Sequence, residues 1–388
     1  MSEFINAIFG SVMSLDPVSA IKMLVMWVVG GVLIYLAIKK DMEPSLLLPM
    51  GFGAILVNLP LSGAVTQIYE TGTEEGALDV LFNAGIANEL FPLLLFIGIG
   101  AMIDFGPLLT NPKLLLFGAA AQFGIFVTMT LACCVNAIFP GMFSIQDAAS
   151  IGIIGAADGP TAIFVGNYFG TQYMGAIIVA AYSYMALVPI IQPPVIRFCT
   201  TKKERLIRMP YEAKSVSKTV RILFPIVVTV IAGLVAPRSV SLVGFLMFGN
   251  LLRECGVLNS LSETAQNVLA NLITIFLGIT IATKMQADAF LSFGTLMVIA
   301  QGLFAFIFDT VGGVMFAKFI NLFSKTKINP MIGACGISAF PMSSRVIHKM
   351  GLKEDPQNFL LMHAAGVNVG GQIASVIAGG LILNLIAR

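Results

Sequence analysis

The stretch IGIIGAADGPTA, residues 151–162, decides how this chain folds. It places the acidic Asp158 inside a run of apolar and small residues and follows it at once with Gly159 and Pro160. Because proline lacks an N–H donor and clashes with the preceding turn, Gly-Pro interrupts a helix. Irregular backbone at membrane depth occurs only inside protein or beside a wet cavity. The stretch therefore predicts a broken membrane helix, with a carboxylate beside freed carbonyl groups and away from lipid.

The whole chain of 388 residues has the composition of an integral membrane protein. Apolar residues make up 57% of it and charged residues only 11%, whereas a typical soluble domain is about 25% charged. A spanning helix needs roughly 20 apolar residues, and such segments recur from end to end. We therefore expect an all-α polytopic membrane protein with membrane lipid around it, no nucleic-acid partner and no sizeable soluble domain.

We expect about eleven membrane elements, of which the last is long enough to hold two. Residues 1–20 lack a charged n-region, so we expect no signal peptide. The elements lie near 21–38, 45–61, 86–104, 114–139, 148–166, 174–199, 219–235, 239–252, 267–282, 290–323 and 328–386.

The opening stretch has a second copy later in the chain. IGACGISAFPMS begins 181 residues after IGIIGAADGPTA and aligns Pro341 with Pro160. The segments FIGIGAMIDFGPLL and FLGITIATKMQADAFL, which begin at Phe96 and Phe276, are 180 residues apart. Matches at nearly one offset indicate two repeats, which are inverted if each crosses the membrane an odd number of times. Transporters of this kind bind their substrates near the midplane, between broken helices of the two repeats.

The repeats divide the chain into four expected parts. These are an N-terminal segment with a leading helix at 1–42, a first repeat at 43–200, a basic cytoplasmic linker at 201–218 and a second repeat at 219–388.

The linker fixes the expected orientation. Residues 200–221 carry seven lysines and arginines, which by the positive-inside rule places them in the cytoplasm. One leading crossing and two repeats of five give eleven crossings, so we predict the N-terminus inside and the C-terminus outside. Lys39 and Lys40 then lie outside, against the same rule.

Asp158 is the strongest functional candidate. An ionisable side chain at membrane depth costs roughly 3 kcal/mol or more and is a functional-site candidate by default. Carboxylate and carbonyl oxygens suit hard cations, so we interpret Asp158 as a sodium ligand. The simpler alternative is a cap on the second half-helix, and the two roles can coexist.

The second repeat offers neutral oxygens and a cation around its own break. The stretch INPMIGACGISAFPMSSR, residues 328–345, contains Asn329 and Ser338, which could complete a cation shell. Ser344 and Arg345 follow, and the guanidinium fork of arginine suits a carboxylate. The alternatives are helix-packing contacts for Ser338 and a snorkelling surface side chain for Arg345.

Five further polar residues lie in apolar surroundings. Tyr182 and Tyr184 point to different faces of a helix, so one could reach the site while the other packs as an ordinary aromatic. Asn368, in a Gly- and Ala-rich stretch, is a candidate ion ligand. Asp104 lies near an element end, and Asp309 is either a second ion-path residue or a buried hydrogen-bonded acid.

Five segments together resemble the β subunit of the sodium-pumping, biotin-dependent decarboxylases of oxaloacetate, methylmalonyl-CoA, glutaconyl-CoA and malonate. They are GAADGPTAIF, AAYSYMALVPIIQPP, FLGITIA, GISAFPMSSRV and MHAAGVNVGGQIAS, and the resemblance runs from about residue 51 to the C-terminus. It implies a subunit in a bacterial cytoplasmic membrane that decarboxylates carboxybiotin on a partner, consumes a proton and exports sodium. It also implies inverted repeats and a homotrimer that works with a biotin carrier, a carboxyltransferase subunit and a small membrane subunit.

The resemblance also implies roles for individual residues. The ion-binding aspartate of the family falls on Asp158 and its proton-handling tyrosine on Tyr184. Its asparagine, serine and arginine fall on Asn329, Ser338 and Arg345. The implied catalytic residues are thus Tyr184, Arg345 and Asp158, and Arg345 and Ser344 are the residues expected to bind the carboxybiotin.

The main alternative is a secondary sodium-coupled transporter of an organic anion that performs no chemistry. It would share the inverted repeats and the broken helices, so architecture cannot separate the two functions. Dependence on a biotinylated partner would separate them. A purely structural membrane subunit would leave Asp158 unexplained.

Overall fold

The computed structural model describes residues 16–40, 43–69, 72–210 and 216–386. Within these ranges every regular element is a helix, except the short antiparallel strands β1 (Gln67–Tyr69) and β2 (Gly72–Glu74). Seven helices there are long and apolar enough to cross a membrane. The helices α4 (Ala77–Gly85) and α5 (Leu90–Met102) form one more candidate span, bent by 63°. The predicted all-α polytopic class is confirmed.

The first half of the chain ends with the long helix α11. The helices of this half are α2 (Pro17–Lys40), α3 (Pro44–Val57), α4, α5, α6 (Gly106–Thr110), η1 (Pro112–Leu114), α7 (Leu115–Ala121), α8 (Phe123–Ile138), α9 (Ile145–Gly152), η2 (Ile153–Ala156), α10 (Gly159–Phe169) and α11 (Met174–Cys199).

The second half follows the short helix α12 (Lys202–Arg205) in the basic linker. Its helices are α13 (Lys218–Val235), η3 (Pro237–Ser239), α14 (Val240–Glu254), α15 (Asn259–Glu263), η4 (Thr264–Leu269), α16 (Ala270–Ile281), η5 (Ala282–Met285), α17 (Ala287–Phe290), α18 (Phe293–Phe323), η6 (Pro330–Gly336), α19 (Met342–Glu354) and α20 (Leu361–Leu385).

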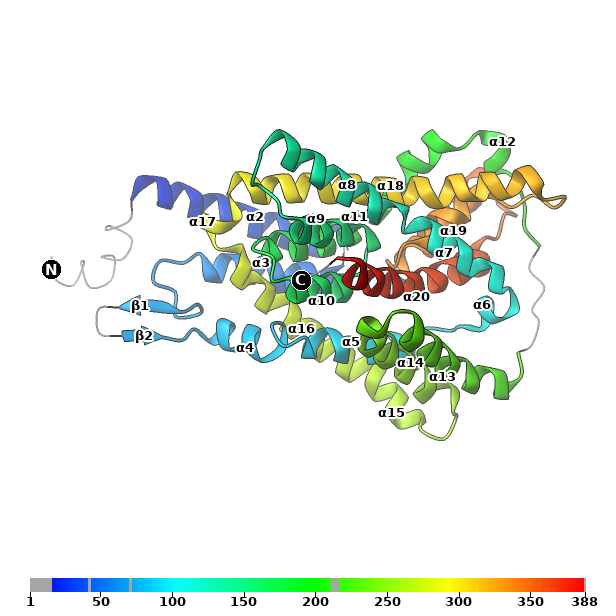
Figure 1. Cartoon of the computed structure of the whole chain (residues 1–388), viewed down its shortest axis with the longest axis horizontal. Coiled ribbons are helices and arrows are strands. Elements are labelled where there is room, and N and C mark those ends of the chain that lie inside the picture. The colour runs from blue at the N-terminus through cyan, green and yellow to red at the C-terminus, as the bar shows by residue number, and fades with distance from the viewer. Residues whose placement is uncertain (1–15, 41–42, 70–71, 211–215, 387–388) are drawn as a thin grey trace.

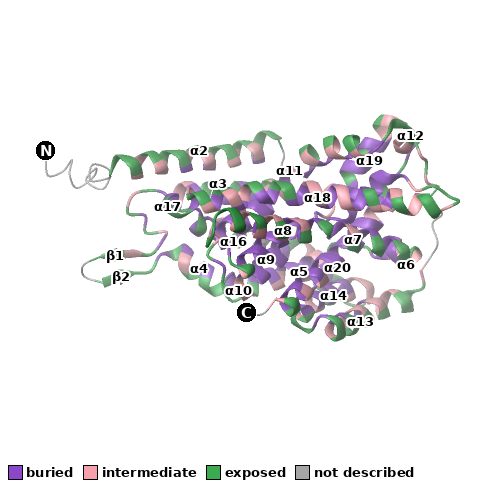
Figure 2. Ribbon diagram, turned by 45° about the horizontal axis from the view of Figure 1, so that its top comes forward, coloured by how far each residue is buried: buried purple, intermediate pink, exposed green. Residues whose placement is uncertain are grey.

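The helices differ in how much of their surface is covered by protein. In α13 only Pro225 and Ala232 are buried, and the rest of this apolar helix faces outward, as suits a helix in lipid. In α20 most residues are buried, and Figure 2 shows it among the purple interior helices. Its small residues permit this close packing, since a Cβ at Gly371 would lie 2.4 Å from the carbonyl oxygen of Gly336. Helix α20 is therefore the central element around which a site can form.

The broken element of the first half folds back on itself. Thr171, just after α10, donates a hydrogen bond of 2.5 Å from its hydroxyl to Oδ1 of Asp147 in the first turn of α9. The start and the end of this element therefore lie side by side, and the chain enters and leaves it at the same end of the molecule. We call residues 145–171 hairpin 1.

The broken element of the second half folds back in the same way. The side-chain amides of Asn329, before η6, and Asn358, after α19, both donate to the carbonyl oxygen of Arg205, at 2.9 and 3.0 Å. The two ends of this element thus meet beside α12. We call residues 329–358 hairpin 2.

Helix α2 runs opposite to the predicted direction relative to the basic linker. Figures 1 and 2 show α2 running from the end of the molecule that carries β1 and β2 toward the end that carries α12. If the linker is cytoplasmic, as the sequence predicts, α2 begins outside, and Lys39 and Lys40 in its last turn agree with the positive-inside rule. The error arose because a broken element was counted as a crossing, although it folds back. The predicted cytoplasmic N-terminus itself falls in residues 1–15, outside the described ranges.

Candidate functional site

The tips of the two hairpins meet in the interior. The backbone N–H of Ser338, just after η6, donates to the carbonyl oxygen of Ala156 at the end of η2, at 3.2 Å. The hydroxyl of Ser338 donates to the carbonyl oxygen of Gly371 in α20, at 3.0 Å. Three segments far apart in sequence therefore converge where the sequence predicted two helix breaks.

Asp158 lies at this junction and is 4% exposed. Ala157 before it has a left-handed backbone with φ 53°, which turns the chain between η2 and α10. Oδ1 of Asp158 accepts the backbone N–H of Thr161 at 3.4 Å, so the carboxylate caps α10. Its Oδ2 accepts the hydroxyls of Thr161 at 2.8 Å and Ser375 at 3.0 Å. The capping role is thus observed, and no Lys or Arg of the described ranges pairs with this carboxylate.

Helix α20 brings two buried amide oxygens to the same region. Asn368 donates from Nδ2 to the carbonyl oxygens of Cys335 and Ile337, at 3.2 and 2.6 Å, which leaves its Oδ1 without a partner among the described residues. Gln372 donates to the carbonyl oxygen of Ser338, and its Oε1 is likewise unpartnered there. A buried acceptor without a partner costs about 1–3 kcal/mol. A bound cation would remove this cost.

The donor set at the hairpin tips suits sodium as a transported ion. It consists of one carboxylate together with hydroxyl, amide and backbone carbonyl oxygens. The described ranges hold no group of three or more His, Cys, Asp or Glu side chains that could bind a metal ion. Oxygen ligands with a single negative charge match a hard monovalent cation.

The structure separates the two tyrosines, as their spacing predicted. Tyr184 is half-buried, donates from its hydroxyl to the carbonyl oxygen of Ile299 at 2.7 Å, and packs its ring near Phe306 of α18. Tyr182 packs against Gly159, where a Cβ would lie 2.1 Å from the ring carbon Cζ. Its hydroxyl is buried and has no partner in the described ranges. Tyr182, rather than Tyr184, therefore lies beside the turn that carries Asp158.

Asn329 lies at the base of hairpin 2 and not at its tip. Its Nδ2 donates to the carbonyl oxygens of Arg205 and Ile207, both at 2.9 Å, and its Oδ1 caps the N–H of Met331. The seven residues of η6 separate Asn329 from the tip, which at a rise of about 2 Å per residue is roughly 14 Å. The structure thus brings Ser338 and Asn368 toward Asp158 but leaves Asn329 on the α12 side.

Arg345, in the first turns of α19, is exposed. Its guanidinium interacts electrostatically with Glu43, in the turn between α2 and α3. Burial raises the pKa of the Glu43 carboxyl above its ordinary value, and the guanidinium of Arg345 acts in the opposite direction. Ser344 is buried and donates to the carbonyl oxygen of Pro341 at 2.8 Å. Arg345 is therefore open to an anion, whereas the hydroxyl of Ser344 is already used within its own helix turn.

Sequence reasoning did not single out several residues of this site. Thr161 follows Asp158 by three residues, the spacing at which an N-cap side chain meets the N3 residue, and this signal was available. Gln372 and Ser375 follow Asn368 by four and seven residues, so the three form one polar face of a helix. Gln192 of α11 accepts a hydrogen bond from the buried hydroxyl of Ser343, at 3.0 Å, and this pairing had no local signal.

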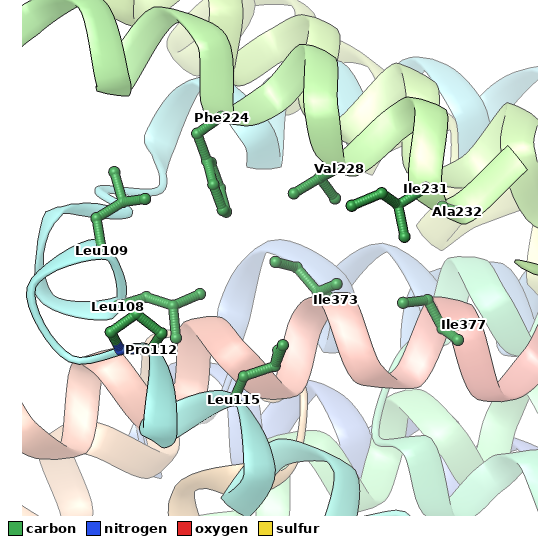
Figure 3. A pocket seen from close by; sticks show the side chains of 10 residues that line it. All are labelled: Leu108, Leu109, Pro112, Leu115, Phe224, Val228, Ile231, Ala232, Ile373 and Ile377. Carbon is green, nitrogen blue, oxygen red and sulfur yellow. The ribbon is translucent and has the colours of Figure 1, made fainter. Parts of the chain in front are cut away.

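The cavity in Figure 3 is not part of this site. It has a volume of about 320 Å³ and lies between α13 and α20, with Phe224 and Val228 on one side and Ile373 and Ile377 on the other. All ten residues that line it are apolar. It therefore offers no side-chain ligand for an ion or a carboxylate.

Comparisons with a family model and with known proteins identify the same family. Residues 22–386 match the family model described as "Na+-transporting oxaloacetate decarboxylase beta subunit". The methylmalonyl-CoA decarboxylase subunit beta of Propionigenium modestum is 50% identical over 379 residues, which cover 93% of this chain and 94% of that protein. The corresponding subunit of Veillonella parvula is 48% identical over 364 residues, with 94% and 93% covered. The probable oxaloacetate decarboxylase beta chain of Vibrio cholerae is 44% identical over 411 residues, with 93% and 95% covered. This chain therefore belongs to the family of the Na+-transporting oxaloacetate decarboxylase beta subunits.

Proposed function

We propose that this chain is the membrane subunit of a sodium-pumping decarboxylase. It would remove carbon dioxide from carboxybiotin on a partner subunit, consume a proton and export sodium. The observation that carries the proposal is the contact of the two hairpin tips, from Ser338 to Ala156, beside the buried carboxylate of Asp158. Family membership favours this function over a secondary transporter of an organic anion, which would use similar architecture.

In this proposal Asp158 supplies the charge of the sodium site. A carboxylate at this depth without a cationic side chain needs a counter-charge, and sodium provides it. Ser338 and Asn368 add neutral oxygens from hairpin 2 and α20. Gln372 and Ser375, on the same face of α20, extend the set of candidate ligands. Asn329 acts from a distance by holding hairpin 2 against the α12 loop.

The proposed chemistry uses Arg345 and Tyr184. Biotin, when its carrier is docked, supplies a labile N-carboxyl group. The exposed guanidinium of Arg345, in the first turn of α19, suits the carboxylate of that group. The hydroxyl of Tyr184 donates a hydrogen bond to the carbonyl oxygen of Ile299. In this proposal Tyr184 gives its proton to the biotin nitrogen once carbon dioxide leaves.

Coupling requires that decarboxylation be blocked while the sodium site is empty. Moving one charge against 100 mV costs about 2.3 kcal/mol, which a decarboxylation can supply only if the two steps depend on each other. The hairpin tips offer a direct link, because the same junction holds the carboxylate and adjoins α11, which carries Tyr182 and Tyr184.

We further propose that the chain consists of two inverted repeats in which α2 is the first element of the first repeat. Contacts between the halves come in exchanged pairs: α3 packs on α16 and α5 on α14, while α11 packs on α18 and α20 on α7. Such pairs are expected if α3 corresponds to α14, α5 to α16, α7 with α8 to α18, and α11 to α20. By the same order α2 corresponds to α13, so five crossings and one hairpin make each half. An odd number of crossings per repeat inverts the second repeat relative to the first.

The repeat proposal is tested by labelling single cysteines in a background without the five native ones. Lys39→Cys should react only with a reagent on the cytoplasmic side, and Ser19→Cys only with one on the outer side. Labelling of Lys39→Cys from the outer side alone would exclude α2 from the first repeat.

The family name implies a complex of several subunits. We propose a biotin carrier, a carboxyltransferase subunit and a small membrane subunit as the partners of this chain, with three copies of the chain in the assembly. Helix α12, in the basic linker, would face the carrier in the cytoplasm.

The function is tested with the purified chain in liposomes and free carboxybiotin as the probe. We expect carbon dioxide release that requires sodium and does not occur with potassium at the same ionic strength. Sodium-driven uptake of an organic anion with no release of carbon dioxide would instead establish the transporter alternative.

A further inference from the structure

Asp309, in the middle of α18, is a second buried carboxylate that the proposed function does not use. It is 0% exposed, and neither of its oxygens is hydrogen-bonded to another side chain among the described residues. In the same ranges no Lys, Arg or His forms an ion pair with it. An ionised carboxylate at membrane depth with no counter-charge is costly. Asp309 must therefore carry a proton or meet a cation.

Two glycines let this carboxyl approach the backbone of other elements. A Cβ at Gly124 of α8 would lie 2.0 Å from Oδ1 of Asp309, and a Cβ at Gly155 of η2 would lie 2.8 Å from Oδ2. Any larger residue at Gly124 would displace the carboxyl. Gly155 precedes Asp158 by three residues in the tip of hairpin 1. The carboxyl of Asp309 thus lies against the tip of hairpin 1, which positions the proposed sodium ligand Asp158.

The surroundings favour a proton over sodium at Asp309. Its oxygens approach the backbones of two glycines, and neither accepts a hydrogen bond from a side chain among the described residues. Sodium needs several oxygens, whereas a proton needs only one. Two side-chain hydroxyls bond to the carboxylate of Asp158, whereas none among the described residues bonds to Asp309.

Both protonation states of Asp309 have physical support. Helix α8 begins at Phe123, so the N–H of Gly124 is one of its first-turn donors without a partner in the helix. The partial positive charge of this helix end stabilises a carboxylate, while burial stabilises the neutral acid. A shift of η2, which contacts Oδ2, changes the balance between these two effects.

The elements that contact α18 carry further titratable groups. Among them are Asp158 at the tip of hairpin 1, Tyr184 on α11, which packs near Phe306 of α18, and Cys335 on η6. None of these three carries a positive charge, and a negative charge on Asp158 would further favour the protonated form of Asp309.

We propose that Asp309 is a proton-binding site coupled to hairpin 1. It holds a proton while the tip of hairpin 1 packs against it, and it releases that proton to water when the tip moves away. The coupling to turnover rests on the proposed function, because only turnover moves the tip. The binding of a proton by Asp309 does not depend on the proposed function.

Infrared spectroscopy of the purified chain tests the proton directly. A protonated carboxyl group has a carbonyl stretch that shifts in D2O, and we expect one such band to disappear in Asp309→Asn, which keeps the shape of the side chain. Asp104→Asn is the matched control, because Asp104 is exposed and paired with Arg221 at 3.2 Å. An identical band in the wild type and in Asp309→Asn would overturn the proposal.

Turnover of the whole complex tests the coupling. We expect Asp309→Asn to remove one ionisation from the pH profile of sodium-dependent decarboxylation, and Asp309→Glu to restore it. A merely structural cap predicts the same pH profile in Asp309→Asn as in the wild type, and that result would overturn the coupling. If the wild-type complex itself shows no sodium-dependent decarboxylation, the proposed function fails, while the infrared band still decides the protonation of Asp309.

Discussion

Hairpin 1 and hairpin 2 both fold back on themselves but carry different chemistry at corresponding places. The tip of hairpin 1 carries the buried carboxylate of Asp158, whereas the tip of hairpin 2 carries the neutral hydroxyl of Ser338. Beyond the tip, hairpin 1 continues into the apolar helix α10, and hairpin 2 continues into α19 with the exposed Arg345.

This difference shows how two similar repeats can make one asymmetric site. Two carboxylates at the meeting point would repel each other and raise the cost of an empty site. With one carboxylate, a single sodium ion balances the charge. The second repeat is then free to contribute neutral oxygens at its tip and a cation for an anionic substrate farther along.

The largest effect is expected at the charged tip. Asp158→Asn keeps the cap on α10 but removes the charge, and loss of one partner of a buried ion pair costs about 3–5 kcal/mol. We expect sodium-dependent decarboxylation to fall by at least about 100-fold, while the protein still inserts and assembles. Near-normal turnover and sodium dependence in this variant would reduce Asp158 to a capping residue.

The next effect separates the two tyrosines. Tyr184→Phe removes only a hydroxyl, and loss of a general acid lowers rates by about 10²–10⁴-fold. We expect such a loss in single-turnover decarboxylation with unchanged thermal stability. Tyr182→Phe is the matched control, since its hydroxyl has no partner in the described ranges. If Tyr182→Phe shows the larger loss, the phenol beside Asp158 is the proton donor instead.

A smaller effect is expected at the neutral tip. Ser338→Ala removes a hydroxyl worth about 1–1.5 kcal/mol, so the sodium concentration for half-maximal rate should rise by about 10-fold. Asn329→Ala should lower the thermal stability and leave that concentration unchanged, because its amide binds the α12 loop. An equal rise in this sodium concentration in both variants would indicate that Asn329 is an ion ligand.

The smallest effect is expected at the bases of the hairpins. Thr171→Val removes the buried hydrogen bond to Asp147 and should cost about 1–1.5 kcal/mol of stability. Glu354→Gln removes an ion pair with Arg205 that remains partly exposed, worth less than about 1 kcal/mol. Denaturation measured by the fluorescence of Trp27 or by circular dichroism gives the two values. A greater loss in Glu354→Gln would make hairpin 2 the more tightly closed of the pair.

Composition and local sequence pattern were sufficient to predict the fold class and the position of the helix breaks. The apolar segments predicted an all-α membrane protein because lipid requires every spanning segment to satisfy its own backbone. Gly159 and Pro160 predicted the interruption beside Asp158 because no helix continues through that pair unchanged. The cap by Asp158 was also foreseen, since an N-cap is a local interaction.

The contacts across the site depended on the tertiary structure. No local pattern in residues 145–171 reveals that the segment folds back rather than crosses, because folding back depends on the contact between Asp147 and Thr171, 24 residues apart. The spacing of Asn368, Gln372 and Ser375 predicts a polar face on α20. It does not predict that this face lies beside Asp158. Local sequence determines where a helix breaks and which side chains it presents. Which breaks meet is decided by the packing of helices that are nearly two hundred residues apart, and no local interaction encodes it.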